Sequence, residues 1–298
     1  MGCTTGSGTT VTEDDVQALV QRLMTSEQST REDYLQALGY LDEAVCEAQA
    51  VGQAQAGRMA APCVGYGTYL FARMCSHGVA AIRAAPLSRW VKSDHQEWGF
   101  NVLACHARAL LEGNLYFHYF MSPTNDALDE GRARVSLLQL NDCCSRLKLM
   151  GSDPKQKAWF EQQRDELIAR LRSIPFYQQL PQQVQAQCEA GKKAWFLDRA
   201  QLVALVGMDK AGFDVLWDLW SQHSHIHPIS FMLMEPNGRG TGLECDPDRV
   251  YLAVAMLVCA GILEGATDKI VEQFPDVANE RKGIGSKFSP GPKSNRRR

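Results

Sequence analysis

Three of the seven histidines in this 298-residue chain lie close together, at His223, His225 and His227. An imidazole can bind a metal ion or transfer a proton near neutral pH, which makes the cluster a candidate site for chemistry. His223 and His227 are four residues apart, the spacing that brings two metal ligands onto one face of a helix. No acidic or cysteine cluster supplies an obvious third ligand, so these two residues are only weak candidates for metal ligands.

The residues around the histidines predict a helix. Residues 213–228 include two tryptophans at helical spacing, and Pro228 should stop the helix. On such a helix Ser224 and His227 share the apolar face, whereas His225 points elsewhere. We therefore expect His227 to be buried and hydrogen-bonded across a bundle of helices, which is a structural role.

A second group of polar residues lies in the apolar segment 105–118. Arg108 and Glu112 are spaced for an ion pair along a helix, and Asn114 falls on the apolar face, where it needs hydrogen-bond partners if buried. We expect this face to meet the helix of residues 213–228. The two helices would then build a small polar pocket lined by Asn114, Tyr116, Ser221 and Ser224.

Helical patterns fill most of the chain, and no alternating run is long enough to predict a sheet. The sequence therefore predicts an all-α multi-helix bundle. We expect a single helical domain over residues 13–275, within which residues 13–60 are a candidate N-terminal subdomain. Residues 1–12 are predicted to be disordered because they are rich in glycine, threonine and serine, and residues 276–298 are predicted to form a basic disordered tail.

Charge is unevenly distributed along the chain. Residues 279–298 hold seven basic residues and one glutamate, a net charge of +6 (7 − 1), although the whole chain carries −3. A basic tail on an acidic body can contact nucleic acid or another anionic surface. The simpler interpretation is a solvated tail.

The sequence predicts a cytoplasmic protein without a membrane span. The longest apolar run, from Val250 to Leu263, is shorter than the roughly 18 residues that a span requires. The ten cysteines form no CxxC pair, and no secretory signal precedes them, so reduced thiols are expected.

Two of these stretches carry a resemblance. An Ala-Arg-x-Leu-Leu-Glu helix followed about a hundred residues later by a Trp-rich helix with serine and His-Pro resembles a large group of uncharacterised bacterial helical proteins, a domain of unknown function. That group is similar in arrangement to HEPN domains, helical bundles of toxin–antitoxin, abortive-infection and phage-defence systems. The resemblance covers roughly residues 60–265 and rests on Arg108, Leu111, Glu112, Tyr116, Trp217, Ser221, Ser224, His225, His227 and Pro228.

The resemblance suggests a ribonuclease, but this sequence departs from the pattern of the HEPN ribonucleases. HEPN ribonucleases carry an arginine four to six residues before a histidine on one helix, and no arginine is so placed before His223, His225 or His227. Here Arg108 would have to act from a different helix, stabilising the phosphorane while His225 or His227 takes the proton of a ribose 2′-hydroxyl.

Three hypotheses follow from these residues. The first is a binding or regulatory module in defence or stress response, with RNA or a protein as partner and a homodimer as one candidate assembly. The second is a metal-independent ribonuclease that uses Arg108 with His225 or His227, and Glu112 is a further candidate catalytic residue. The third is a metal-dependent hydrolase that uses His223 and His227. No cofactor is implied.

Overall fold

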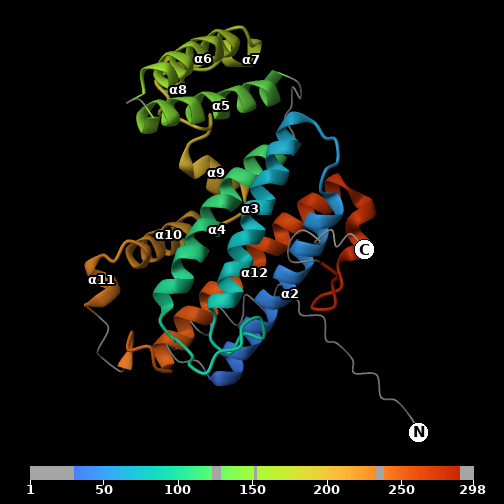
Figure 1. Ribbon diagram of the computed structural model, residues 1–298, viewed down its shortest axis with the longest axis vertical. Helices are drawn as coiled ribbons and strands as arrows, with labels where there is room; N and C mark the ends of the chain where they lie inside the picture. Colours follow the sequence, from blue (N-terminus) through green and yellow to red (C-terminus); the bar gives the residue numbers. More distant parts are fainter. Residues whose placement is uncertain (1–29, 123–128, 151–152, 233–237, 289–298) are drawn as a thin grey trace. The chain divides into compact units, whose positions relative to one another are not determined.

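The structure is a computed structural model that describes residues 30–122, 129–150, 153–232 and 238–288. These residues form helices and no β-strand, which confirms the predicted all-α multi-helix fold (Figure 1). The predicted disorder of residues 1–12, the helix predicted to begin at residue 13 and the last ten residues of the basic tail lie outside the described residues.

The chain divides into two compact units. The first comprises Met1–Ala54, Met74–Leu111 and Val215–Arg298, and the second comprises Gln55–Arg73 and Glu112–Asp214. The predicted single domain over residues 13–275, with its candidate subdomain 13–60, stays a prediction.

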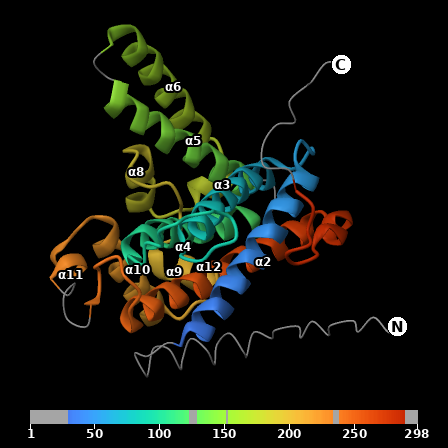
Figure 2. The same ribbon diagram turned by 60° about the horizontal axis from the view of Figure 1, so that its bottom comes forward.

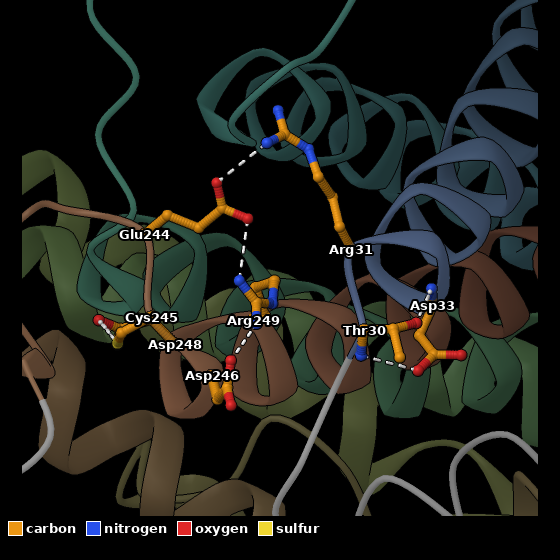
Figure 3. Close-up of polar contacts among 8 residues, drawn as sticks. All are labelled: Thr30, Arg31, Asp33, Glu244, Cys245, Asp246, Asp248 and Arg249. Carbon is orange, nitrogen blue, oxygen red and sulfur yellow. Dashed lines mark hydrogen bonds and ion pairs between the residues drawn. The ribbon is translucent and has the colours of Figure 1, made fainter.

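The first unit is built on two long helices, α2 (Arg31–Gln55) and α12 (Asp246–Gln273), which run alongside each other in both views (Figures 1 and 2). Thr30 and Asp33 cap the start of α2. The Asp33 amide donates to Thr30 Oγ1 at 3.1 Å, and the Thr30 amide donates to Asp33 Oδ2 at 2.9 Å. The sequence Ser29-Thr30-Arg-Glu-Asp predicts a helix start, and the reciprocal cap at Thr30 confirms it (Figure 3). The unit also contains parts of α3 (Pro62–Ala84), α4 (Phe100–Met121) and α10 (Lys210–Ser224), with α11 (Pro228–Phe231) and the 3₁₀-helix η2 (Pro275–Glu280).

Helix α3 comes close to α2 and α12 at Gly78. A Cβ atom placed on Gly78 would lie 2.8 Å from Leu263 Cδ1 and 3.2 Å from Val45 Cγ2. Both of these side chains are buried. The packing of these three helices therefore depends on a residue without a side chain at position 78.

Helix α12 is the apolar centre of the first unit. Among the described helices it alone is long and apolar enough to cross a membrane, and 72% of its most apolar window is buried inside the protein. It is packed here as a core helix.

The second unit contains a pair of helices, α5 (Asp129–Met150) and α6 (Pro154–Arg172), that lie side by side in both views (Figures 1 and 2). Asp153 caps α6 by accepting the Lys155 amide at 2.9 Å. The pair shares a hydrophobic core with α7 (Pro175–Gln178) and α8 (Gln182–Glu189), and α9 (Arg199–Leu205) follows them in the chain.

One predicted helix begins later than its composition suggests. The sequence pattern predicts a helix from Trp90 to about Met121, but α4 begins at Phe100. The Trp90 indole donates to Asp42 Oδ1 at 2.7 Å, and the Leu87 amide donates to Gln96 Oε1 at 2.6 Å. These side-chain hydrogen bonds hold the segment before α4 in an irregular conformation.

The described residues after η2 contact the body of the protein. The residues that follow η2 pack on the first unit, where Arg281 Nε donates to Glu47 Oε2 at 2.7 Å and the Gly283 amide donates to Glu47 Oε1 at 2.8 Å. The Phe288 ring stacks on Trp90 with centroids 5.7 Å apart. The chain therefore packs on the first unit as far as residue 288, and the disordered tail predicted over residues 276–298 stays a prediction.

Candidate functional site

Arg108 lies on α4 against α10. Its Nε donates a hydrogen bond to Ser221 Oγ at 3.0 Å, and its guanidinium carbon is 3.1 Å from the centroid of a Trp217 ring. The Ser221 hydroxyl in turn donates to the Trp217 carbonyl at 2.6 Å. The structure confirms that the two helices meet here. A cation–π contact of this kind contributes on the order of 1 kcal/mol, so Arg108 helps to fix α10.

The other residues predicted on α4 belong to the second unit. Tyr116 Oη donates to Glu112 Oε1 at 3.2 Å, and the Tyr116 ring lies 4.0 Å from the Trp195 ring, centroid to centroid. Asn114 is buried, and its Oδ1 is the one buried side-chain nitrogen or oxygen in the described chain without a hydrogen-bond partner. Since Ser221 and Ser224 lie in the first unit, the pocket predicted from these four residues stays a prediction.

Helix α10 begins as predicted and ends earlier than predicted. The sequence predicts Asp209 as the cap of this helix, and Asp209 Oδ2 accepts the Gly212 amide at 2.8 Å, which confirms it. The helix ends at Ser224, because Ile226 adopts a left-handed conformation with φ of 54° and the His227 amide donates to the Gln222 carbonyl at 3.0 Å. This closes the helix in the manner of a C-terminal capping turn.

The early end of α10 reverses the predicted roles of the histidines. His227 is exposed, and its extended conformation suits a residue that precedes a proline. The prediction that His227 is buried is therefore wrong. His225 is exposed, off the apolar face as predicted. Ser224 donates its hydroxyl to the Trp220 carbonyl at 2.7 Å.

His223 is the buried histidine of the cluster, with 6% of its surface exposed. Its Nε2 lies 3.4 Å from Arg239 Nη2, and its ring meets Phe100 edge-on with centroids 4.9 Å apart. Burial, together with the charge of Arg239, lowers the pKa of His223 to about 4, although Asp248 opposes this shift. His223 is therefore neutral at pH 7, and its Nε2 can accept a hydrogen bond from Arg239.

The glycine-rich stretch of residues 236–242 is predicted from its sequence to be a flexible connection, but its described part, residues 238–242, makes specific contacts. Asp248 is 1% exposed and accepts the Gly240 amide at 2.9 Å and the Cys245 thiol at 3.2 Å. The Arg239 guanidinium carbon lies 4.2 Å from the Tyr251 ring centroid. Three glycines of the loop have φ between 71° and 80°, a region that glycine adopts without strain.

The geometry expected of a metal pair does not form. His223 is buried on α10 beside Arg239, whereas His227 lies beyond the helix end. Among the residues that the structure describes, no three histidine, cysteine, aspartate or glutamate side chains are grouped to hold a metal ion. His223 and His227 therefore do not lie on one face of a common helix, which is the arrangement that motivated the metal-dependent hydrolase.

An exposed surface follows the end of α10, and we call it the 225–232 surface. It presents the imidazoles of His225 and His227, whose ring centroids are 5.8 Å apart. It also presents four large apolar side chains with the exposed fractions 77% for Ile226, 44% for Ile229, 48% for Phe231 and 72% for Met232. Several exposed apolar side chains in one short segment are typical of a binding surface.

The apolar residues of this surface were not among the predicted site residues. The signal in the sequence is the run Ile229-Ser-Phe-Met that follows Pro228, which is too short to form a core helix of its own. The spacing of the histidines therefore predicts a site in this segment, but it carries no information about the exposure of the apolar residues that follow.

Comparison with known proteins yields no relative, since no family model, curated protein or solved structure matches the chain.

Proposed function

We propose that this protein is a cytoplasmic helical binding or regulatory module, HEPN-like in arrangement, that engages a protein partner through the 225–232 surface. The observation that carries this proposal is the exposure of Ile226, Ile229, Phe231 and Met232 beside two exposed imidazoles. Aromatic and methionine side chains are enriched in the cores of protein interfaces, which suits Phe231 and Met232 as anchors.

The charge of the surface favours a protein over RNA. Binding to nucleic acid depends on lysine and arginine side chains that neutralise phosphates. Residues 225–232 contain neither, and the exposed groups are apolar apart from the two imidazoles and one serine. An apolar partner surface therefore complements these residues better than a phosphate backbone.

The surface rests on a fixed support. The last two turns of α10 are held by Arg108, through Ser221 and Trp217, and by Arg239 beside His223. A surface that is ordered before binding loses less conformational entropy when a partner docks. In this proposal Arg108 and His223 position the surface and do not contact the partner.

One observation favours the metal-independent ribonuclease as a second candidate. His225 and His227 are both exposed and their rings are close together, so one could serve as general base and the other as general acid in RNA cleavage. Arg108 would have to leave Trp217 and Ser221 to reach a phosphorane, and for that reason we favour the binding module.

The proposal is tested by site-specific photocrosslinking in cells. A photoreactive phenylalanine analogue replaces Phe231 in the full chain, and a matched variant carries it at Leu149, which is 81% exposed on α5. We expect a discrete covalent adduct with one protein from position 231 and none from position 149. Equal labelling at both positions would contradict the proposal.

A nuclease assay separates the two candidates. We expect the purified full chain to leave a pool of single-stranded and structured RNA intact. Cleavage that is lost in both the His225→Ala and the His227→Ala variants would establish the ribonuclease instead.

A further inference from the structure

Residues 281–288 lie as a strap against α2 and α12, and we call them the strap. Arg281 joins the two helices, because its Nε donates to Glu47 Oε2 on α2 at 2.7 Å and its Nη1 donates to Asp268 Oδ1 on α12. The second oxygen of Glu47 accepts the Gly283 amide at 2.8 Å. One carboxylate on α2 therefore binds the strap through both a side chain and the backbone, with charge-assisted hydrogen bonds.

The last residue of the strap lies on an aromatic face that the body of the protein holds in place. The Phe288 ring stacks on Trp90 with centroids 5.7 Å apart and planes inclined by 15°. The Trp90 indole donates to Asp42 Oδ1 on α2 at 2.7 Å, and Arg89 Nη2 donates to the same oxygen at 2.9 Å. None of the groups that orient Trp90 belongs to the strap, so the aromatic face does not depend on it.

The surface beneath the strap is acidic. Glu43 and Glu47 on α2 and Glu264 and Asp268 on α12 all act electrostatically on one another around Arg281. Partial burial raises the pKa of Glu264, and the other three carboxylates add to this shift, although Arg281 opposes it. A concentration of carboxylates attracts a basic segment. We call these four carboxylates together with Trp90 the strap seat.

Between its two ends the strap contacts the seat at some positions and solvent at others. Gly283 has φ of 54°, which favours glycine, and a Cβ atom there would lie 3.7 Å from Glu43 Cδ. Ser286 is 7% exposed, and its Oγ accepts the Lys282 amide at 2.9 Å. Ile284, in contrast, is 59% exposed. The contact positions are therefore an arginine, a glycine two residues later, a serine five residues later and an aromatic residue seven residues later.

The strap can leave the seat without disrupting a helix. Its residues follow η2 and form no helix of their own, and the side chains that orient Trp90 stay in place without them. A segment on a short tether has an effective concentration on the order of millimolar at its binding site. A separate segment of the same chemistry must overcome this intramolecular competition before it binds.

We propose that the strap seat is a binding site for a basic segment of a partner protein and that the strap occupies it in cis as an autoinhibitory segment. The partner segment supplies an arginine to Glu47 and Asp268, a glycine that approaches Glu43, and an aromatic ring to Trp90. It binds the fraction of molecules in which the strap has left, which lowers its apparent affinity by that fraction. The inference concerns residues other than those of the 225–232 surface and does not rest on the function proposed for that surface.

Binding of a labelled synthetic peptide to the full chain tests the inference. The peptide has the sequence of residues 281–288, Arg-Lys-Gly-Ile-Gly-Ser-Lys-Phe, and its fluorescence anisotropy is measured. The full chain with Arg281→Ala and Phe288→Ala, in which the strap is released, should bind the peptide at least about tenfold more tightly than the wild type does. Adding Glu47→Gln to this variant should remove that gain. Adding Glu32→Gln should not, because Glu32 is exposed in the first turn of the same helix.

A second measurement uses the wild type and does not depend on how well any variant folds. Hydrogen–deuterium exchange of residues 281–288 is followed without peptide and with several millimolar unlabelled peptide. We expect the amides of Gly283, Gly285 and Ser286 to exchange faster when the peptide displaces the strap. A scrambled peptide of the same composition should leave their exchange unchanged.

Four outcomes would overturn the inference. The first is no peptide binding by the released variant together with unchanged exchange in the wild type. The second is binding that Glu47→Gln leaves intact, which would place the peptide elsewhere. The third is equal binding of the scrambled peptide, which would show attraction by charge alone. The fourth is a wild-type dimer that Glu47→Gln dissociates, which would identify the strap of a second copy as the segment bound.

Discussion

At the scale of single residues, burial decides which histidine has which role. A helical projection that continues to Pro228 places His227 on the apolar face, but α10 ends at Ser224 and His223 takes the buried position. The histidine cluster and the helix that leads into it could both be predicted from the sequence, but the end of that helix could not. The error arose because the position of the helix end depends on Ile226 adopting a left-handed conformation, which a β-branched residue rarely does.

The depressed pKa of His223 predicts a specific pH dependence of stability. The folded state keeps His223 neutral down to about pH 4, whereas the unfolded chain protonates it near its ordinary pKa of 6.5. The unfolded state therefore binds more protons between these values, and the free energy of unfolding falls as the pH is lowered through this window. We expect His223 to account for a loss of about 1–3 kcal/mol between pH 7 and pH 4.

Urea unfolding at pH 7 and at pH 4.5 measures this contribution. The His223→Gln variant should lose less stability between the two pH values than the wild type does. His95→Gln is the matched control, because the His95 side chain is 73% exposed, and it should change the pH dependence less than His223→Gln does. An unchanged pH dependence in His223→Gln would contradict the assignment of a buried neutral imidazole.

Backbone strain at Ile226 gives a second prediction at this scale. Glycine relieves the steric cost of φ near 54°, so Ile226→Gly should raise the free energy of unfolding by about 0.5–1 kcal/mol. Ile226→Ala removes most of the apolar side chain but keeps a Cβ atom, and it should bring no such gain. Both variants are compared by the urea midpoint at pH 7, and equal midpoints would show that the turn is unstrained.

At the scale of elements, local pattern predicted helices well and their ends less well. The cap of α2 at Thr30, the cap of α10 at Asp209 and the α5–α6 pair follow from signals that lie within each element. The irregular segment before α4 and the packed residues after η2 depend on distant partners. Trp90 bonds to Asp42 and Arg281 bonds to Glu47, and local periodicity carries no information about such pairs.

The close approach of α3 to α2 and α12 predicts a contrast between two glycine substitutions. Gly78→Ala should lower the free energy of unfolding by about 1–3 kcal/mol, because its Cβ would crowd the buried side chains of Leu263 and Val45. Gly265→Ala on α12 meets nothing within 4 Å and should be neutral or stabilising by up to about 1 kcal/mol, since alanine favours helix.

Chemical unfolding of the two variants at the same pH checks this contrast. Since both changes replace glycine with alanine inside a helix, the difference between them isolates the packing at position 78. A Gly78→Ala variant as stable as Gly265→Ala would mean that the three helices are not packed closely at that point.

At the scale of the whole molecule, composition and periodicity predicted the fold class and could not predict the surface. The all-α architecture follows from helical patterns spread along the chain. The exposure of Phe231 and Met232 depends on where α10 ends and on what packs around the turn that follows. Those are tertiary properties, and a sequence read one segment at a time assigns such residues to the core.

The central claim is that the 225–232 surface binds a protein partner, and a binding titration tests it most directly. The partner identified by crosslinking at position 231 is purified and titrated into the wild type, Phe231→Ser and the control Leu149→Ser. We predict that Phe231→Ser weakens the affinity by about tenfold to a hundredfold, as expected of an aromatic anchor, while Leu149→Ser binds like the wild type. Wild-type affinity in Phe231→Ser would contradict the claim.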